Sequence, residues 1–284
     1  MTRNLQQALD GARSAGLDRL DAQLLLLRAI GRPDGDRAWL MAHDDERLPA
    51  DAAVRFDEFV RRRLGNEPVA YLTGRKEFFG LDLAVDRRVL VPRPDTETLV
   101  HWSLEVIEMT AMPPNPSVLD LGTGSGAIAL AIAHTRQAAG RPASVTAVDA
   151  SADALAVAHE NARTLGLAVQ FIQSNWLDGV NGRFDLIASN PPYIASADPH
   201  LAALEHEPLQ ALASGADGLD DIRRIVRDAP RHLAAGGWLL LEHGYDQAAA
   251  VRDLLVAGGF SGVQSRCDLA GIERCSGGRW QTAG

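Results

Sequence analysis

The chain has 284 residues, of which 46% are hydrophobic and 23% charged, and its formal net charge is −9. These values exclude a disordered or fibrous chain and predict a soluble globular protein of one large or two modest domains. The acidic balance argues against a protein that wraps nucleic acid, because such a protein needs a basic surface.

The charge is unevenly distributed along the chain. Residues 1–90 carry 15 basic and 15 acidic side chains, so the excess of acidic residues lies entirely in residues 91–284. Such a shift predicts two parts with different roles.

The amino-terminal sequence MTRNLQQALD is polar and lacks the apolar run of a signal peptide. The longest aliphatic run, Leu24–Leu27, is too short to cross a bilayer. Cys267 and Cys275 match neither a CxxC redox pair nor half of a zinc site, so we expect two free thiols. Together these features predict a cytoplasmic protein.

Residues 2–64 have apolar side chains at three- and four-residue spacing, which predicts helices interrupted at Gly31–Pro33 and Leu48–Pro49. One helix is expected to end at Arg61–Arg63. Cations suit the negative end of the helix dipole, so a solvated helix end is the simple interpretation and a partner-binding patch is the alternative.

The pattern changes in residues 66–93. Phe78–Leu83 and Asp86–Val91 alternate or run apolar, which predicts a β-hairpin. Two prolines then flank Arg93 and disfavour helix around it. A further helix is expected from about residue 94 to 109.

After residue 116, short apolar segments alternate with helical ones. This alternation predicts an α/β fold with a mainly parallel sheet of seven strands and helices on both faces. Helices are expected at 126–135, 152–165, 219–233 and 247–257. Strands are expected at Val118–Leu121, Ser144–Val148, Val169–Gln173, Phe184–Ser189, Trp238–Glu242 and Gly262–Arg266, with a last one in the tail that ends at Arg279–Trp280.

A glycine-rich loop, Gly122–Gly126, follows the first of these strands and leads into a helix. Glycines permit a tight turn and let a ligand approach the backbone closely. No lysine follows, which excludes a Walker phosphate-binding loop, and the later glycine of the dinucleotide fingerprint is absent. The loop alone is weak evidence for a ligand, because many strand-to-helix turns use glycine.

Asp149 ends the second expected strand, 23 residues after Gly126. A carboxylate at this place can accept hydrogen bonds from both hydroxyls of a ribose. The alternative is that it caps the helix beginning near Ser151. The loop and the acid together predict a nucleoside-containing ligand outside the carboxyl ends of the strands.

The fourth expected strand ends in the corner Asn190–Tyr193, whose sequence is Asn-Pro-Pro-Tyr. Two consecutive prolines make the turn rigid and remove two backbone donors. The Asn190 side-chain oxygen and the Pro191 carbonyl can then act as paired acceptors for an NH2 group, and Tyr193 can lie against a planar amide or base. A purely structural turn is the alternative.

These motifs resemble the class I S-adenosylmethionine-dependent methyltransferases that methylate planar amino groups, which implies a Rossmann-like fold. The corner alone does not separate adenine, guanine and glutamine as acceptors. Other segments are similar to the bacterial release factor glutamine methyltransferases, namely 67–74 (EPVAYLTG), 77–80 (EFFG), 91–97 (VPRPDTE), 242–244 (EHG) and 268–274 (DLAGIER).

The resemblance implies methyl transfer from S-adenosylmethionine to the side-chain amide nitrogen of the glutamine in the Gly-Gly-Gln motif of release factors 1 and 2. Trp176 would flank the adenine, although the sequence also allows a core tryptophan. The implied cofactor contacts are Gly122, Thr123, Gly124, Ser125, Gly126, Asp149, Trp176 and Asn190. The implied glutamine contacts are Asn190, Pro191, Pro192 and Tyr193, of which Asn190, Pro191 and Tyr193 are the catalytic residues.

The same resemblance predicts a helical substrate-recognition domain at 1–73, a β-hairpin linker at 74–93 and a methyltransferase domain at 94–284. We expect a monomer whose protein substrates are release factors 1 and 2, with no direct nucleic-acid partner and no membrane partner.

Three alternatives to this function remain at this point. They are methylation of adenine or guanine in DNA or RNA, methylation of a glutamine in a ribosomal protein, and cofactor binding without turnover. A nucleic-acid substrate calls for a basic groove, and the acidic charge of residues 91–284 counts against one. His200, Glu205, His206 and Glu207 lack the HExxH spacing, so we expect a solvated or substrate-facing loop there and no metal.

Overall fold

A computed structural model describes residues 3–109 and 112–281. The chain forms two compact units, Met1–Arg75 and Lys76–Gly284. No helix within the described ranges is long and apolar enough to cross a membrane. Both cysteines are free thiols, Cys267 exposed and Cys275 buried, as the sequence predicts.

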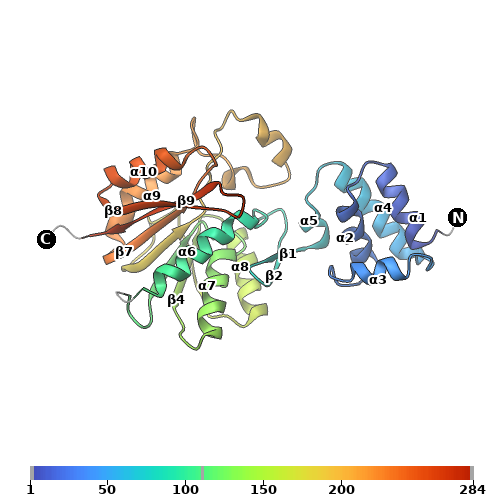
Figure 1. Ribbon diagram of the computed structural model, residues 1–284, viewed down its shortest axis with the longest axis horizontal. Helices are drawn as coiled ribbons and strands as arrows, with labels where there is room; N and C mark the ends of the chain where they lie inside the picture. Colours follow the sequence, from blue (N-terminus) through green and yellow to red (C-terminus); the bar gives the residue numbers. More distant parts are fainter. Residues whose placement is uncertain (1–2, 110–111, 282–284) are drawn as a thin grey trace. The chain divides into compact units, whose positions relative to one another are not determined.

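The first unit is helical (Figure 1). Leu25–Leu27 and Phe56 are fully buried in its core. The breaker residues act as predicted, because one helix ends at Ala29, before Gly31, and another begins directly after Pro49. Its helices are α1 Leu5–Ser14, α2 Arg19–Ala29, α3 Arg37–Ala42, α4 Ala50–Leu64 and α5 Val69–Thr73.

The three arginines at the end of α4 are all ion-paired within this unit. Arg61 pairs with Glu58, Arg62 with Glu67, and Arg63 with Asp21. Helix α4 ends at Leu64, so the predicted helix end is confirmed. These pairs favour the interpretation of the triplet as a helix terminus.

A β-hairpin leads into the second unit, with β1 at Arg75–Phe78 and β2 at Leu81–Ala84. The predicted strands at 78–83 and 86–91 are therefore wrong. Phe79 and Gly80 have φ values of 51° and 77°, which form a tight turn in the middle of the first predicted strand. The following residues 85–93 contain no strand.

The second unit contains a seven-stranded sheet in the order β5-β4-β3-β6-β7-β9-β8. All neighbours are parallel except β9, which runs antiparallel to β7 and β8. The predicted mainly parallel sheet is confirmed. Its strands are β3 Ser117–Leu121, β4 Ser144–Asp149, β5 Gln170–Gln173, β6 Phe184–Ser189, β7 Leu233–Glu242, β8 Phe260–Cys267 and β9 Glu273–Trp280.

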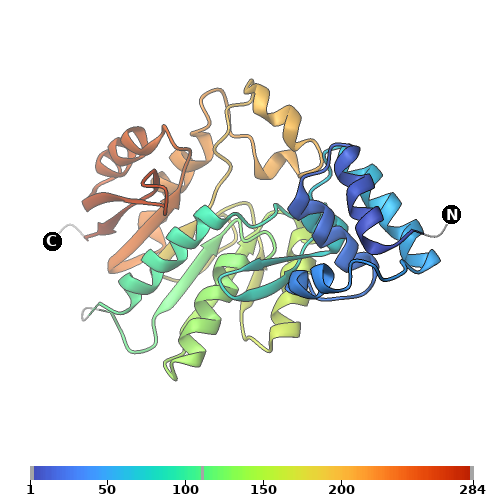
Figure 2. The same cartoon turned by 45° about the vertical axis from the view of Figure 1, so that its right-hand side comes forward.

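Helices cover both faces of this sheet (Figure 1, Figure 2). Helices α6 Glu97–Ile107, α7 Ala127–Ala138 and α8 Ala152–Leu165 bury one core with alternate strand residues such as Val118. Helices α9 Asp220–Asp228 and α10 Ala248–Ala257 bury the other with residues such as Leu119. Successive residues of a strand face opposite sides of the sheet. Since Val118 lies in one core and Leu119 in the other, β3 is apolar on both faces.

One predicted helix is shorter than expected. The sequence predicts helix over 219–233, whereas α9 ends at Asp228 and a 3-10 turn follows at Ala229–Arg231. Pro230 lacks the N–H that would continue the α-helix. Strand β7 then begins at Leu233, five residues before the predicted start at Trp238. The prediction missed these residues because Gly236 and Gly237 interrupt the apolar pattern of the sequence.

Asn161, a buried residue of α8, connects the hairpin to the glycine-rich loop. Its Oδ1 accepts the backbone N–H of Ala84 at 2.7 Å. Its Nδ2 donates to the carbonyls of Ala84 and Ser125 at 3.0 and 2.9 Å. The end of β2 and the loop after β3 are therefore fixed by one side chain.

Candidate active site

A cavity of about 250 Å³ lies at the carboxyl ends of the central strands. Strands β4 and β5 lie on one side of β3, and β6 and β7 on the other, so the order of the sheet reverses between β3 and β6. Ligands of open α/β sheets bind at this type of position. The Ser189 hydroxyl donates to the Leu121 carbonyl at 2.7 Å, which holds these two strand ends together.

The glycine-rich loop forms one wall of the cavity. Gly122, Gly124 and Gly126 all have positive φ values, of 72°, 56° and 87°. A Cβ atom at Gly122 would lie 3.2 Å from the ring of Trp176, whereas one at Gly124 would meet nothing within 4 Å. The loop therefore needs glycine for its backbone conformation, and it leaves open space beside Gly124.

Asp120, on strand β3, fixes the start of helix α7 below this loop. Its Oδ2 accepts hydrogen bonds from the Thr123 hydroxyl at 2.6 Å and from the Ala129 N–H at 3.1 Å. Burial raises the pKa of the Asp120 carboxyl to about 7, and the two hydrogen bonds oppose this shift. No local pattern in the sequence indicates this role.

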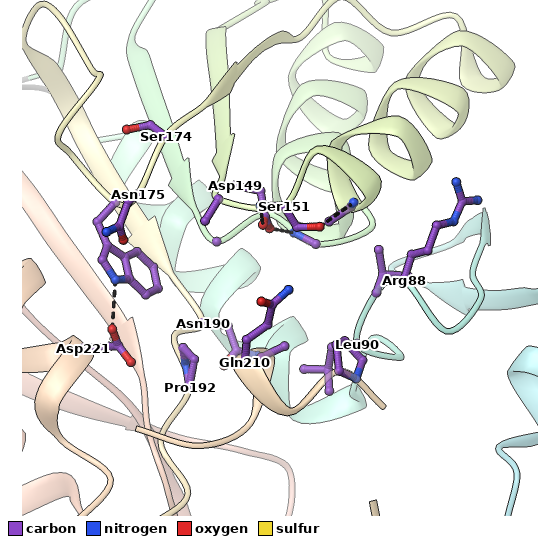
Figure 3. A pocket seen from close by; sticks show the side chains of 18 residues that line it. Arg88, Leu90, Asp149, Ser151, Ser174, Asn175, Asn190, Pro192, Gln210 and Asp221 are labelled. Carbon is purple, nitrogen blue, oxygen red and sulfur yellow. Dashed lines mark hydrogen bonds between the residues drawn. The ribbon is translucent and has the colours of Figure 1, made fainter. Parts of the chain in front are cut away.

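Asp149 lies at the end of β4 and lines the cavity (Figure 3). One carboxylate oxygen accepts the Gly124 N–H at 2.9 Å, and the other accepts the Ser151 N–H at 2.9 Å. Ser151 is itself the N-cap of α8. The Ser151 hydroxyl, which accepts the Ala154 N–H, caps the helix, and Asp149 holds this capping residue without being the cap itself. Each carboxylate oxygen of Asp149 retains a further lone pair for a ligand.

Trp176 lines the same cavity and is only partly buried. It has a φ of 54°, an uncommon conformation for a residue other than glycine. Its indole N–H donates to Asp221 Oδ1 at 2.9 Å, the dashed contact in Figure 3. Asp221 Oδ2 accepts the Ser214 hydroxyl at 2.7 Å. The indole is therefore held at the cavity wall, although part of it also packs against the core.

The Asn-Pro-Pro-Tyr corner closes another side of the cavity, to which it contributes Asn190 and Pro192. The Asn190 Nδ2 donates to the buried Thr96 hydroxyl at 3.1 Å. The Tyr193 hydroxyl donates to Glu242 Oε1 at 3.4 Å, and burial raises the pKa of this tyrosine. The corner is thus connected to side chains from two other segments of the fold.

Glu242 ends strand β7 beside this corner and is fully buried. Burial raises the pKa of its carboxyl to about 7, and the charge of Asp95 adds to this shift. Hydrogen bonds from Thr96 and Tyr193 oppose it, as does the guanidinium of Arg274. Arg274 also pairs with Asp95 and Asp268, so these charges form one connected cluster.

The loop after the corner supplies a further wall through Pro208, Gln210 and Ala211, and Figure 3 shows the Gln210 side chain extending into the cavity. Glu207 is buried, pairs with Arg93 and accepts the Val91 N–H at 3.1 Å. The expectation of a solvated or substrate-facing loop is therefore wrong for the Glu207 side chain. The described parts of the chain contain no cluster of three His, Cys, Asp or Glu residues that could hold a metal.

The structure gathers only some of the predicted site residues around this cavity. Gly122, Gly124, Asp149, Trp176, Asn190 and Pro192 line it. Thr123, Ser125, Gly126, Pro191 and Tyr193 are not among the residues that line it. The lining also includes Arg88, Val89, Leu90, Gln210 and Asp221, which the sequence did not single out.

Comparison with known proteins gives two matching family models. The family described as "Methyltransferase small domain" matches residues 104–250, and "PrmC N-terminal domain" matches residues 3–74. A release factor glutamine methyltransferase from Burkholderia pseudomallei is 49% identical over 277 residues, 94% of each chain. One from Pseudomonas aeruginosa is 49% identical over 266 residues, 92% of each chain.

A solved structure supports the fold independently. The N-terminal domain of human METTL16, solved in complex with SAH, is 17% identical to this chain, with a TM-score of 0.51. The match covers 72% of this chain and 77% of that one. At this identity the likeness concerns the fold alone.

Proposed function

Because the chain belongs to the family of release factor glutamine methyltransferases, we propose that it methylates a glutamine of peptide chain release factors. The methyl group comes from S-adenosylmethionine, and the acceptor is the side-chain amide nitrogen of the glutamine in the Gly-Gly-Gln motif of release factors 1 and 2. The observation that carries this proposal is the position of Asn190, whose amide lies at the cavity beside Asp149 and Trp176.

The residues around the cavity fit S-adenosylmethionine. The free lone pairs of the Asp149 carboxylate suit ribose hydroxyls, and the indole of Trp176 offers a flat face for adenine. The open space beside Gly124 lets a ligand contact the backbone of the loop. When bound, the cofactor supplies an electrophilic methyl group on a sulfonium.

The corner residues act on the substrate glutamine. An amide nitrogen is a poor nucleophile, because its lone pair is delocalised into the carbonyl. We assign the Asn190 side-chain oxygen and the Pro191 carbonyl as acceptors for the two amide hydrogens, with Tyr193 supporting the corner. Two such acceptors orient the lone pair and raise its electron density, so correct positioning provides much of the catalysis. No strong general base is required, since the methylated amide can lose its proton late.

We further propose that residues 1–73 recognise the protein substrate, that 74–93 act as a linker, and that 94–284 carry the catalytic machinery. The protein would act as a monomer in the cytoplasm, without direct contact to nucleic acid or membrane. The ion-paired arginines at the end of α4 favour recognition through other surfaces of the helical unit.

A methyl-acceptor assay tests the function directly. Labelled S-adenosylmethionine is offered with purified release factor 1 or 2, with variants in which the Gly-Gly-Gln glutamine is replaced, and with DNA, RNA and ribosomal protein. We expect label only in the release factors that retain this glutamine. Label in nucleic acid or ribosomal protein but in neither release factor would refute the proposal, and label in the glutamine variants would refute the assigned acceptor.

A further inference from the structure

Asn190 can serve as an acceptor only if its side-chain amide is turned the right way. Its oxygen and its NH2 group have nearly the same shape, so packing alone distinguishes the two orientations poorly. In the wrong orientation, the Asn190 NH2 group would face the N–H groups of the substrate amide. Both groups are hydrogen-bond donors, so no hydrogen bond could form between them. Some neighbouring group must therefore set the orientation.

Thr96 is the neighbour that contacts this amide. It belongs to the 3-10 turn Pro94–Thr96 that precedes α6, and it is only 4% exposed. Its hydroxyl oxygen lies 3.1 Å from Asn190 Nδ2, across 94 positions of sequence. A threonine hydroxyl has a single proton and could by itself either donate or accept.

Glu242 removes this ambiguity. The Thr96 hydroxyl is hydrogen-bonded to the Glu242 side chain, which also accepts the Tyr193 hydroxyl. In its ionised form this carboxylate only accepts hydrogen bonds, so it then takes the Thr96 proton and leaves the Thr96 oxygen as an acceptor. That acceptor matches the NH2 group of Asn190 and is repelled by its carbonyl oxygen.

We propose that Thr96 and Glu242 are positioning residues that hold the Asn190 amide with its oxygen turned toward the substrate. Glu242 accepts from Thr96, Thr96 accepts from Asn190, and Asn190 is left to accept from the substrate amide. The proposal rests on the proposed function for its catalytic consequence, but the orientation of Asn190 is a property of the protein alone.

Two substitutions at Thr96 test this relay. Thr96→Val keeps the shape and removes the hydroxyl, whereas Thr96→Ser keeps the hydroxyl. We expect Thr96→Val to lower kcat roughly 10- to 100-fold, the effect of losing one orienting hydrogen bond. The Kd for S-adenosylmethionine should change less than about threefold, and Thr96→Ser should restore most of kcat. Thr146→Val, which removes another buried hydroxyl in the same unit, serves as the control for folding.

A third variant tests the role of Glu242. Glu242→Gln keeps the size of the side chain but can donate an N–H to Thr96, which frees the Thr96 proton to turn toward Asn190. We expect a loss of kcat without a loss of thermal stability, a combination that a merely structural role would not produce. Unchanged kcat in Thr96→Val, or equal losses in Thr96→Val and Thr96→Ser, would overturn the relay.

A readout without turnover separates this proposal from the proposed function. The side-chain amide signals of Asn190, identified in ¹⁵N NMR spectra by their loss in Asn190→Ala, should shift and exchange faster in Thr96→Val. Unchanged signals would overturn the relay even if release factors are methylated. If the signals change but the wild type methylates no release factor, the proposed function fails and the relay stands.

Discussion

The buried carboxyl group of Glu242 should make the stability of the protein depend on pH. One of its oxygens, Oε2, has no hydrogen-bond partner among the described residues, and the side chain is only 2% exposed. Burial raises its pKa from 4.5 to about 7. The folded protein therefore resists ionisation of this group at a pH where the unfolded chain ionises freely.

The sign and size of the effect follow from this shift. Below pH 4.5 the group is neutral in both states and contributes its full stability, which is lost as the pH rises toward 7. A tenfold change in an ionisation equilibrium corresponds to about 1.4 kcal/mol, so the rise of the Glu242 pKa from 4.5 to about 7 corresponds to about 3 kcal/mol. Glu242→Gln cannot ionise, so it should gain about this much relative to wild type between acidic and mildly basic pH.

Denaturant unfolding of both proteins across this pH range measures the difference, and tryptophan fluorescence is a suitable signal because Trp102 and Trp238 pack together in the core. Glu160→Gln is the matched control. The Arg163 side chain lowers the pKa of this exposed glutamate, so its substitution should give the opposite sign. A stability difference between Glu242→Gln and wild type that stays constant with pH would refute the reasoning.

Three further predictions concern the cavity and its walls. Asn190→Ala should reduce kcat far more than it weakens cofactor binding, because the side chain is assigned to the substrate amide. Steady-state kinetics and calorimetric titration with S-adenosylmethionine measure the two effects, and near wild-type turnover would contradict the prediction. Gly122→Ala should weaken cofactor binding at least tenfold, roughly 1.4 kcal/mol. The new Cβ would lie 3.2 Å from the Trp176 ring, and the residue has a φ of 72°, which strains any side chain. Equal calorimetric titration curves for the variant and the wild type would contradict the prediction. Glu207→Ala should destabilise the second unit by roughly 2 kcal/mol and raise KM for the protein substrate, since it breaks a largely buried pair with Arg93 beside the wall formed by Pro208–Ala211. Thermal unfolding and steady-state kinetics check both parts, and an unchanged KM would show that this wall does not contact the substrate.

The sequence predicts the fold best where strands are fully buried. Strand Phe184–Ser189 and helix Ala152–Leu165 have the predicted bounds, because a mostly apolar segment identifies the first and a clear helical period the second. The hairpin and the start of β7 were misplaced, because Phe79–Gly80 forms a turn inside an apolar run and Gly236–Gly237 lies inside a strand. The turn in the hairpin is a local feature that the apolar run hides. The start of β7 depends on pairing with β6, where Leu233 lies opposite Phe184, and the local pattern does not contain this contact.

The candidate site likewise contains residues that the sequence predicts and residues that it does not. The residues predicted from strand ends, such as Asp149 and Asn190, lie together because the carboxyl ends of parallel strands meet at one edge of the sheet. Thr96, Asp221 and Glu207 contribute through partners far away in the sequence, at separations of 94, 45 and 114 positions. No local spacing marks such residues, although 91–97 and 242–244 already stood out through the family resemblance.

The Asn161 side chain has a consequence for local fluctuations. Its oxygen and its Nδ2 are engaged with the backbone of two segments outside its own helix, at Ala84 and Ser125. If either segment opens, buried polar groups lose their partners in both, at a cost of roughly 1–3 kcal/mol for each group. The end of the hairpin and the glycine-rich loop should therefore open together as one cooperative unit, and their amide hydrogens should exchange with solvent at a common free energy.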